Sequence, residues 1–131
     1  KIEEITIKLK PDTIYTHFGN DLNTDHKVCF ECTSVAVRPY RNAFVNKILA
    51  FEVPSSSGIY PANVFSPNLF IGISSQVFKK KISAIKCYGK EVDEGDQPRS
   101  LKKISSLMSY RGSNINSKYA EAFQIIFQSE N

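Results

Sequence analysis

Both histidines of this chain lie in one ten-residue segment, from His17 to His26, with the sequence HFGNDLNTDH. The same segment contains the carboxylates Asp21 and Asp25. Imidazole is the commonest protein ligand for metals and a frequent proton carrier, and a nearby carboxylate can orient a neighbouring group. These side chains therefore allow metal-assisted or acid–base chemistry. A second interpretation stays open, in which Asp21, Asn23 and Asp25 only cap the following helix.

The sequence around this segment predicts a strand before it and a helix after it. Residues 13–16 (TIYT) are typical of a short buried strand. The apolar spacing from about Thr24 to Val37 predicts a helix, which Arg38-Pro39 closes because the residue before proline resists helical geometry. The histidines and acids then lie where a strand ends and a helix begins. In open α/β folds, ligands bind at that edge.

Helices and strands alternate along the rest of the chain, which predicts an α/β sandwich in a single domain, residues 1–131. We expect a helix over residues 1–10, although the alternation in this segment also fits a strand. The other expected elements are strands at 45–53, 68–73 and 122–127, a helix at 76–90, and a helix from Pro98 to about Arg111 with Gly112 as its C-cap. No strand precedes the first helix, so we expect part of the sheet to lie upstream.

Composition is that of an ordinary globular domain. The chain has 131 residues, of which 41% are hydrophobic and 23% charged, so it can bury a core. A net charge of +4, dispersed basic residues and the absence of tryptophan disfavour a nucleic-acid surface. No segment approaches the roughly 20 apolar residues of a membrane span, so we expect no span, no secretory signal and a cytoplasmic protein.

Three cysteines are present, and two of them, Cys29 and Cys32, have CxxC spacing on the predicted helix. A zinc knuckle would need a second such pair, which the sequence lacks. We interpret these cysteines as buried thiols in a reducing compartment.

Several catalytic classes are excluded by the absence of their motifs. The sequence has no GxSxG elbow for a serine nucleophile and no glycine-rich phosphate loop. One histidine does not make a zinc site, since a catalytic zinc usually takes three protein ligands. Further candidates are Glu52 at a strand end, and Tyr60 and Phe65 in the long loop 54–67, which either line a pocket or seal the loop onto the core.

Short motifs follow one another in order along nearly the whole chain. They are Tyr15-Thr16-His17, Gly19-x-Asp21-Leu22-Asn23-x-Asp25-His26, Arg38-Pro39, Phe51-Glu52-Val53-Pro54, Phe65-x-Pro67-Asn68, Gln97-Pro98-Arg99-Ser100 and Tyr119-Ala120-Glu121-Ala122-Phe123. Together they resemble the LmbE-like/PIG-L family of zinc-dependent N-acetylglucosamine deacetylases. The resemblance implies a Rossmann-like three-layer sandwich with a mostly parallel sheet. The family's His-Pro-Asp-Asp motif is absent, which implies a C-terminal portion of that fold, incomplete at its N-terminal side.

The resemblance also implies roles for individual residues. His26 would be a zinc ligand, and Asp25 a carboxylate that orients a catalytic side chain. Asn23 stands where many members have a histidine; its amide can donate a hydrogen bond to an oxyanion but cannot transfer a proton. His17 is then the candidate for the acid. Arg38 and Arg99 are candidate substrate-binding cations, and Gln97 replaces a family histidine.

Two functions follow as hypotheses. In the first, zinc (Zn²⁺) assists removal of the N-acetyl group from an N-acetylated amino sugar or its conjugate, with this chain carrying half of the site. In the second, the chain is a non-catalytic truncated module that binds sugar or associates with itself. We expect the chain to form a homo-oligomer or to be completed by a missing N-terminal segment.

Overall fold

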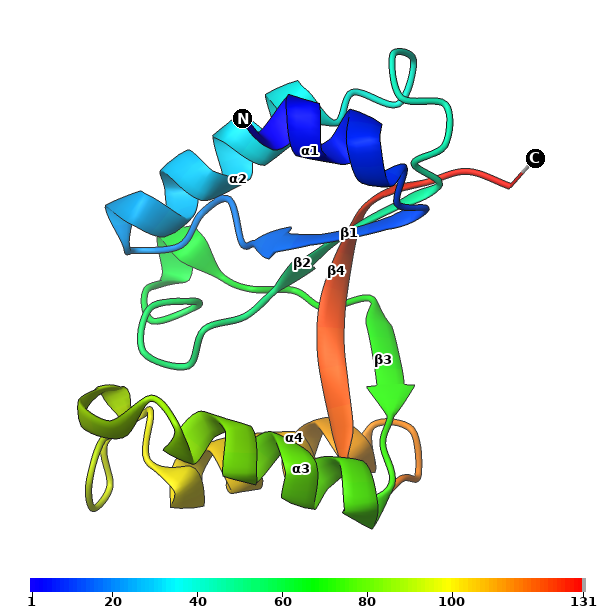
Figure 1. Cartoon of the computed structure of the whole chain (residues 1–131). Coiled ribbons are helices and arrows are strands. Elements are labelled where there is room, and N and C mark those ends of the chain that lie inside the picture. The colour runs from blue at the N-terminus through cyan, green and yellow to red at the C-terminus, as the bar shows by residue number, and fades with distance from the viewer. Residues whose placement is uncertain (131) are drawn as a thin grey trace. The chain divides into compact units, whose positions relative to one another are not determined.

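The computed structural model describes residues 1–130 and contains one open four-stranded sheet with helices (Figure 1). The elements are α1 (Ile2–Leu9), β1 (Thr13–His17), α2 (Thr24–Ala36), β2 (Lys47–Phe51), the 3-10 turn η1 (Pro61–Asn63), β3 (Leu69–Gly72), α3 (Ser75–Lys86), the 3-10 turn η2 (Gly89–Glu91), α4 (Leu101–Ser113) and β4 (Ala120–Gln128). The strands lie in the order β1-β2-β4-β3. The expected α/β class is therefore confirmed. Among the described residues, no helix is long and apolar enough to span a bilayer.

The sheet is mixed, so the expectation of a mostly parallel sheet was wrong. β1 and β2 run parallel, but β2 and β4 run antiparallel. β3 is also antiparallel to β4, because Asn68 N–H donates to the Phe123 carbonyl and Ile73 N–H donates to the Tyr119 carbonyl. The cause is the pair of helices between these strands. A single helix would carry the chain across to start a parallel strand, whereas α3 and α4 together return it to the point it left.

The chain forms two compact units. The first contains residues 1–68 and the final segment from Phe123, and the second contains Leu69–Ala122.

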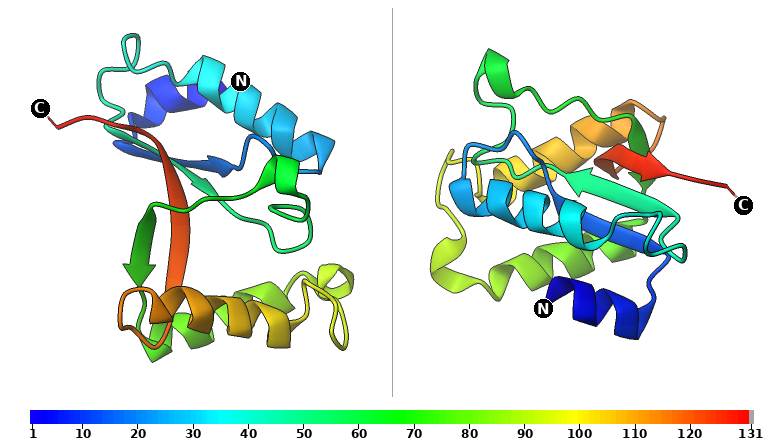
Figure 2. Two further views of the ribbon diagram at one scale, coloured as in Figure 1. Left: turned by 180° about the vertical axis from the view of Figure 1, so that it is seen from behind. Right: turned by 90° about the horizontal axis from the view of Figure 1, so that it is seen from above.

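In the first unit, α2 packs on β1 and α1 packs on α2. Figure 2 shows these two helices next to each other in both of its views. The core is built around Val37, Val45 and Ile48. β2 lies between β1 and β4, and its residues Ile48, Leu49 and Ala50 are buried on both faces. The C-terminal ends of β1 and β2 lie together, because His17 pairs with Phe51.

The second unit places α4 against β3. Gly112 lies inside α4 and is buried, so its expected role as a C-cap was wrong. A Cβ atom there would lie 2.5 Å from the Ser117 carbonyl oxygen, so only glycine allows the backbone this close. The stacked rings of Phe78 and Tyr119, with centroids 4.0 Å apart, join α3 to the start of β4.

Three further expectations from the sequence need correction. The helix expected to 90 ends at Lys86, and the chain continues into η2, where Gly89 has a positive φ of 52°. The fourth helix begins at Leu101 rather than Pro98, because the Ser100 hydroxyl caps it by accepting from Lys103 N–H. Cys32 is exposed, so the paired cysteines are not both buried thiols.

Candidate active site

The two histidines lie at the junction that the sequence predicts. β1 ends at His17, and α2 begins at Thr24, which places His26 in the first turn of the helix. Their rings stack with centroids 4.2 Å apart and an interplanar angle of 19°. The His17 ring also contacts Phe51, the last residue of β2, with centroids 4.7 Å apart. The histidine pair therefore lies beside the adjoining ends of two parallel strands, with His17 on β1 and His26 on α2.

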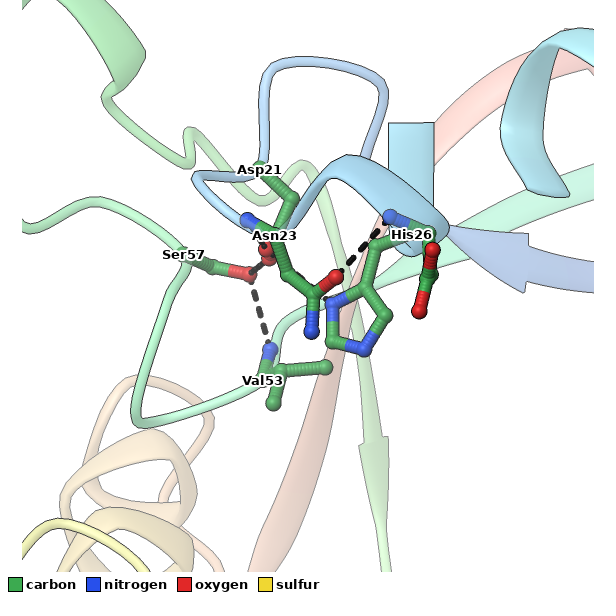
Figure 3. A network of polar contacts seen from close by, with 6 residues as sticks. Asp21, Asn23, His26, Val53 and Ser57 are labelled. Carbon is green, nitrogen blue, oxygen red and sulfur yellow. Dashed lines mark hydrogen bonds and ion pairs between the residues drawn. The ribbon is translucent and has the colours of Figure 1, made fainter. Parts of the chain in front are cut away.

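A single buried carboxylate, Asp21, organises this junction. Its side chain is fully buried (0% exposed). Oδ1 accepts a hydrogen bond from Asn23 N–H at 2.9 Å and contacts His26 Nδ1 at 3.0 Å. Oδ2 accepts from the Ser57 hydroxyl (Figure 3). A buried charge needs such partners, since an ion without hydrogen bonds is costly away from water.

These donors keep Asp21 ionised. Burial on its own raises the pKa of this carboxyl, but the donors together outweigh burial and hold the pKa below its ordinary value. In order of size they are the Ser57 hydroxyl, the Asn23 backbone, the Ser56 hydroxyl and the His26 ring. The Ser56 hydroxyl acts by proximity only, because it makes no hydrogen bond of good geometry.

The charge on Asp21 determines which ring nitrogen of His26 faces it as a donor. An ionised carboxylate can only accept hydrogen bonds, so His26 Nδ1 must carry the proton that lies between them. In the neutral ring, Nε2 then has a free lone pair. The side chain is 20% exposed, so a ligand can reach it. His26 is therefore prepared to bind a metal or accept a proton through Nε2.

His17 differs from His26 in having a buried ring nitrogen without a partner. Its Nδ1 makes no hydrogen bond among the described residues. Burial lowers the pKa of His17, the charge of His26 lowers it further, and Asp21 opposes both. His17 is therefore neutral near pH 7. A neutral imidazole can accept a proton or bind a metal, but it must gain a proton before it can act as the expected acid.

The loop after β2 completes the site from the other strand. Val53 N–H donates to the Ser57 hydroxyl oxygen at 2.8 Å. Leu22 N–H donates to the Ser56 carbonyl at 3.1 Å, which ties this loop to the segment between β1 and α2. The sequence names Asp21 only as a carboxylate near the histidines or as a helix cap, and it assigns Ser57 no role. The spacing of five residues between Asp21 and His26 is the available signal for their contact, whereas no sequence signal distinguishes Ser57 from its neighbouring serines.

Asn23 and Asp25 form the helix start. Asn23 is the N-cap of α2, and its side-chain oxygen accepts from Asp25 N–H at 2.9 Å. This is the capping arrangement that the sequence left open as an alternative. Both side chains are exposed. The carboxylate that contacts His26 is Asp21, while Asp25 faces solvent in the first turn of the helix.

The two candidate arginines lie in different units. Arg38, in the first unit, is half-buried and donates to the Tyr40 hydroxyl at 3.2 Å. Arg99, in the second unit, is held by Glu91 at 2.9 Å and by Asp93 at 3.2 Å. The Asp93 hydrogen bond, supported by Glu91, raises the pKa of Arg99 above its ordinary value.

These side chains fit one zinc ligand rather than a whole zinc site. Within residues 1–130, no three histidine, cysteine, aspartate or glutamate side chains are grouped so as to hold a metal ion. A catalytic zinc usually takes three protein ligands. His26 suits one of these positions, because a zinc-binding histidine typically donates its other N–H to a carboxylate. The remaining ligands would have to come from beyond these residues.

Comparisons with known proteins identify the fold. No family model and no curated protein matches the sequence. Similar solved structures include the 4-carboxy-2-hydroxymuconate hydratase GalB from Pseudomonas putida (TM-score 0.73, 21% identity) and the conserved protein TT1542 from Thermus thermophilus (0.72, 17%). A third is the A40926 pseudoaglycone deacetylase Dbv21 (0.67, 15%).

Each of these likenesses covers 99% of this chain but only 58%, 58% and 55%, respectively, of the other chain. The chain therefore spans less than two thirds of the length of these proteins. At these identities the likeness shows the fold alone. This chain has a fold that a hydratase and a deacetylase share.

Proposed function

We propose that this chain carries one side of the active site of a zinc-dependent hydrolase, which removes the N-acetyl group from an N-acetylated amino sugar or its conjugate. The observation that carries the proposal is the Asp21–His26 pair at the end of β1, with Nε2 of His26 left free. The resemblance to LmbE-like/PIG-L deacetylases, and the fold shared with Dbv21, support the reaction class.

The roles of the residues follow from their positions. His26 would hold zinc through Nε2, and Asp21 would fix the ring. When bound, zinc supplies polarisation of the amide carbonyl and a lower pKa for the attacking water. Asn23 and Asp25 are exposed at the start of α2 and would contact substrate there. The Asn23 amide would donate a hydrogen bond to the developing oxyanion.

The remaining roles in the proposal are those of Asp25, His17 and the two arginines. Asp25 would orient a catalytic group, as the resemblance implies. Arg38 and Arg99 remain candidate substrate-binding cations, each within its own unit. His17, neutral near pH 7, would have to gain a proton in the reaction cycle before protonating the leaving amine.

Zinc content and deacetylation test this function together. They should be measured on the longest natural polypeptide that contains these residues, with acetate release from N-acetylglucosamine and its conjugates as the assay. We expect about one zinc per chain, lost in His26→Ala together with activity. Lys27→Ala is the matched control, because Lys27 is the exposed neighbour of His26. Zinc retained in full by His26→Ala would overturn the assignment.

The alternative proposal, a non-catalytic module, rests on a different observation. The described residues supply no three-ligand group, and α1 exposes Ile5 (57%), Ile7 (53%) and Leu9 (69%). Apolar surface of this kind favours self-association. Analytical ultracentrifugation would then show a dimer or larger assembly that Ile5→Lys dissociates, while the metal and acetate assays stay negative.

A further inference from the structure

The Ser57 hydroxyl stands in the middle of a series of hydrogen bonds that joins the two loops of the site. Val53 N–H donates to Ser57 Oγ, and Ser57 in turn donates to Asp21 Oδ2 (Figure 3). Asp21 Oδ1 accepts from the His26 ring. The series therefore runs from the backbone after β2, through one hydroxyl and one carboxylate, to the imidazole on α2.

The direction of every bond in this series is determined. A backbone N–H can only donate, so the Ser57 oxygen is the acceptor from Val53. An ionised carboxylate can only accept, so the Ser57 proton points to Asp21 and the His26 Nδ1 proton does the same. While Asp21 is charged, no other arrangement of the protons satisfies all of these hydrogen-bonding groups.

Ser57 also determines how the Asp21 carboxylate is turned. Oδ1 is shared by Asn23 N–H and His26 Nδ1, while Ser57 is the side-chain partner of Oδ2. Without that hydroxyl, a buried oxygen loses its donor, and the carboxylate can rotate away from the imidazole. The ring would then be free to adopt the Nε2-protonated form, which histidine prefers in water.

We propose that Ser57 is a positioning residue that acts through Asp21 to hold His26 in its Nδ1-protonated tautomer, with Nε2 free. The expected effect of Ser57 on zinc affinity rests on the proposed function, but its effect on the tautomer of His26 does not. Carboxylates and other groups that orient a metal-binding histidine typically change metal affinity about 10- to 100-fold when they are removed.

Nitrogen-15 NMR of the histidine rings in the metal-free chain tests this inference. Spectra recorded well above the ordinary histidine pKa of about 6.5 report which ring nitrogen is protonated. For the wild type we expect Nδ1 of His26 to be protonated and Nε2 to carry the lone pair. In Ser57→Ala, the two nitrogen shifts of His26 should move toward each other, as the tautomers mix.

Two variants make this result specific. Ser57→Thr keeps the hydroxyl and should restore the wild-type shifts. Ser55→Ala, in the same loop, is the matched control, because the Ser55 hydroxyl has no hydrogen bond among the described residues. An Nε2-protonated His26 in the wild type would overturn the inference without any mutant. So would unchanged shifts in a folded Ser57→Ala protein.

Zinc binding, measured separately on the longest natural polypeptide that contains these residues, distinguishes this inference from the proposed function. We expect Ser57→Ala to bind zinc at least about tenfold more weakly than Ser57→Thr. A tautomer change in Ser57→Ala, combined with no zinc binding by the wild type, would support the role of Ser57 and refute the zinc enzyme. Zinc binding that is equal in all variants, with an unchanged tautomer, would refute the role of Ser57 alone.

Discussion

The segment from His17 to His26 and the segment from Glu91 to Lys103 lower carboxylate pKa values in two different ways. In the first, Asp21 is buried and is stabilised by hydroxyl, backbone and ring donors. In the second, the Arg99 hydrogen bond lowers the pKa of Asp93, and Lys102 followed by Lys103 lowers that of Asp96, which is exposed. The direction of the shift is the same, but its physical origin is not.

This difference determines what each carboxylate can do. Exposed ion pairs contribute little to stability and are screened by salt, so they mainly fix the course of a surface loop. A buried carboxylate surrounded by fixed donors keeps its charge and its orientation at any ionic strength. Only the buried arrangement can orient a histidine for chemistry.

Replacement of Asp21 should have the largest effect. Asp21→Ala leaves buried donors from Asn23 and Ser57 unpaired, and we expect a loss of about 3 kcal/mol in the free energy of unfolding. Urea denaturation measures it. Asp25→Ala, an exposed acid in the first turn of α2, should cost no more than about 1 kcal/mol. Equal losses in the two variants would show that Asp21 is not the organising residue.

The stability lost in glycine-to-alanine variants should differ between the two segments, because their glycines are packed differently. A Cβ at Gly19 would lie 2.7 Å from the Phe30 ring, and we expect Gly19→Ala to cost about 2 kcal/mol. Gly95 has open space around it but a positive φ of 60°, so Gly95→Ala should cost about 1 kcal/mol through backbone strain. Adding Phe30→Leu should recover part of the Gly19→Ala loss in urea denaturation and leave the Gly95→Ala loss unchanged.

The loss of folding stability at low pH should depend on salt in one segment and not in the other. The folded-state pKa of Asp21 lies below its unfolded value of about 3.9, so its contribution is complete above that pH. The contribution is lost as pH falls through the folded pKa. In about 1 M salt, the loss of folding stability on protonation of Asp21 should persist. The pH-dependent stability contributed by Asp93 and Asp96 should disappear. This prediction is checked by measuring the urea midpoints of Asp21→Asn and Asp93→Asn across this pH range, with and without salt.

Removal of Arg99 should have the smallest effect. Glu91 is exposed, Arg99 and Asp93 are partly exposed, and solvent screens the attraction between them. We expect Arg99→Ala to shift the urea midpoint slightly at low salt and not at all in about 1 M salt. A large, salt-independent loss would mean that Arg99 supports the fold in the way that Asp21 does.

The sequence predicts the local parts of this structure well. The strand at 13–16, the helix from Thr24 and the start of the helix expected at 76–90 depend on apolar spacing and capping residues that are close in sequence. The position of both histidines at a strand end follows directly. The ordered motifs also indicated a fold that a deacetylase shares.

The parts that failed depend on distant contacts. The direction of β4 depends on where two helices return the chain, which periodicity does not encode. The role of Gly112 depends on the backbone at 117–119. Asp21 and Ser57 are 36 residues apart, so the bond between them is invisible to any local pattern. The burial of Asp21 likewise becomes evident only once the loop after β2 covers it.

The bond between Ile73 N–H and the Tyr119 carbonyl, 2.9 Å long, closes a long excursion of the chain at a single point. Everything between these residues leaves the sheet and comes back to the same place. Because the entropic cost of closing a loop rises only slowly with its length, the mostly exposed connection between α3 and α4 can be lengthened at little thermodynamic cost. It is therefore the natural place for relatives to diverge in size, and for an engineer to graft a foreign element.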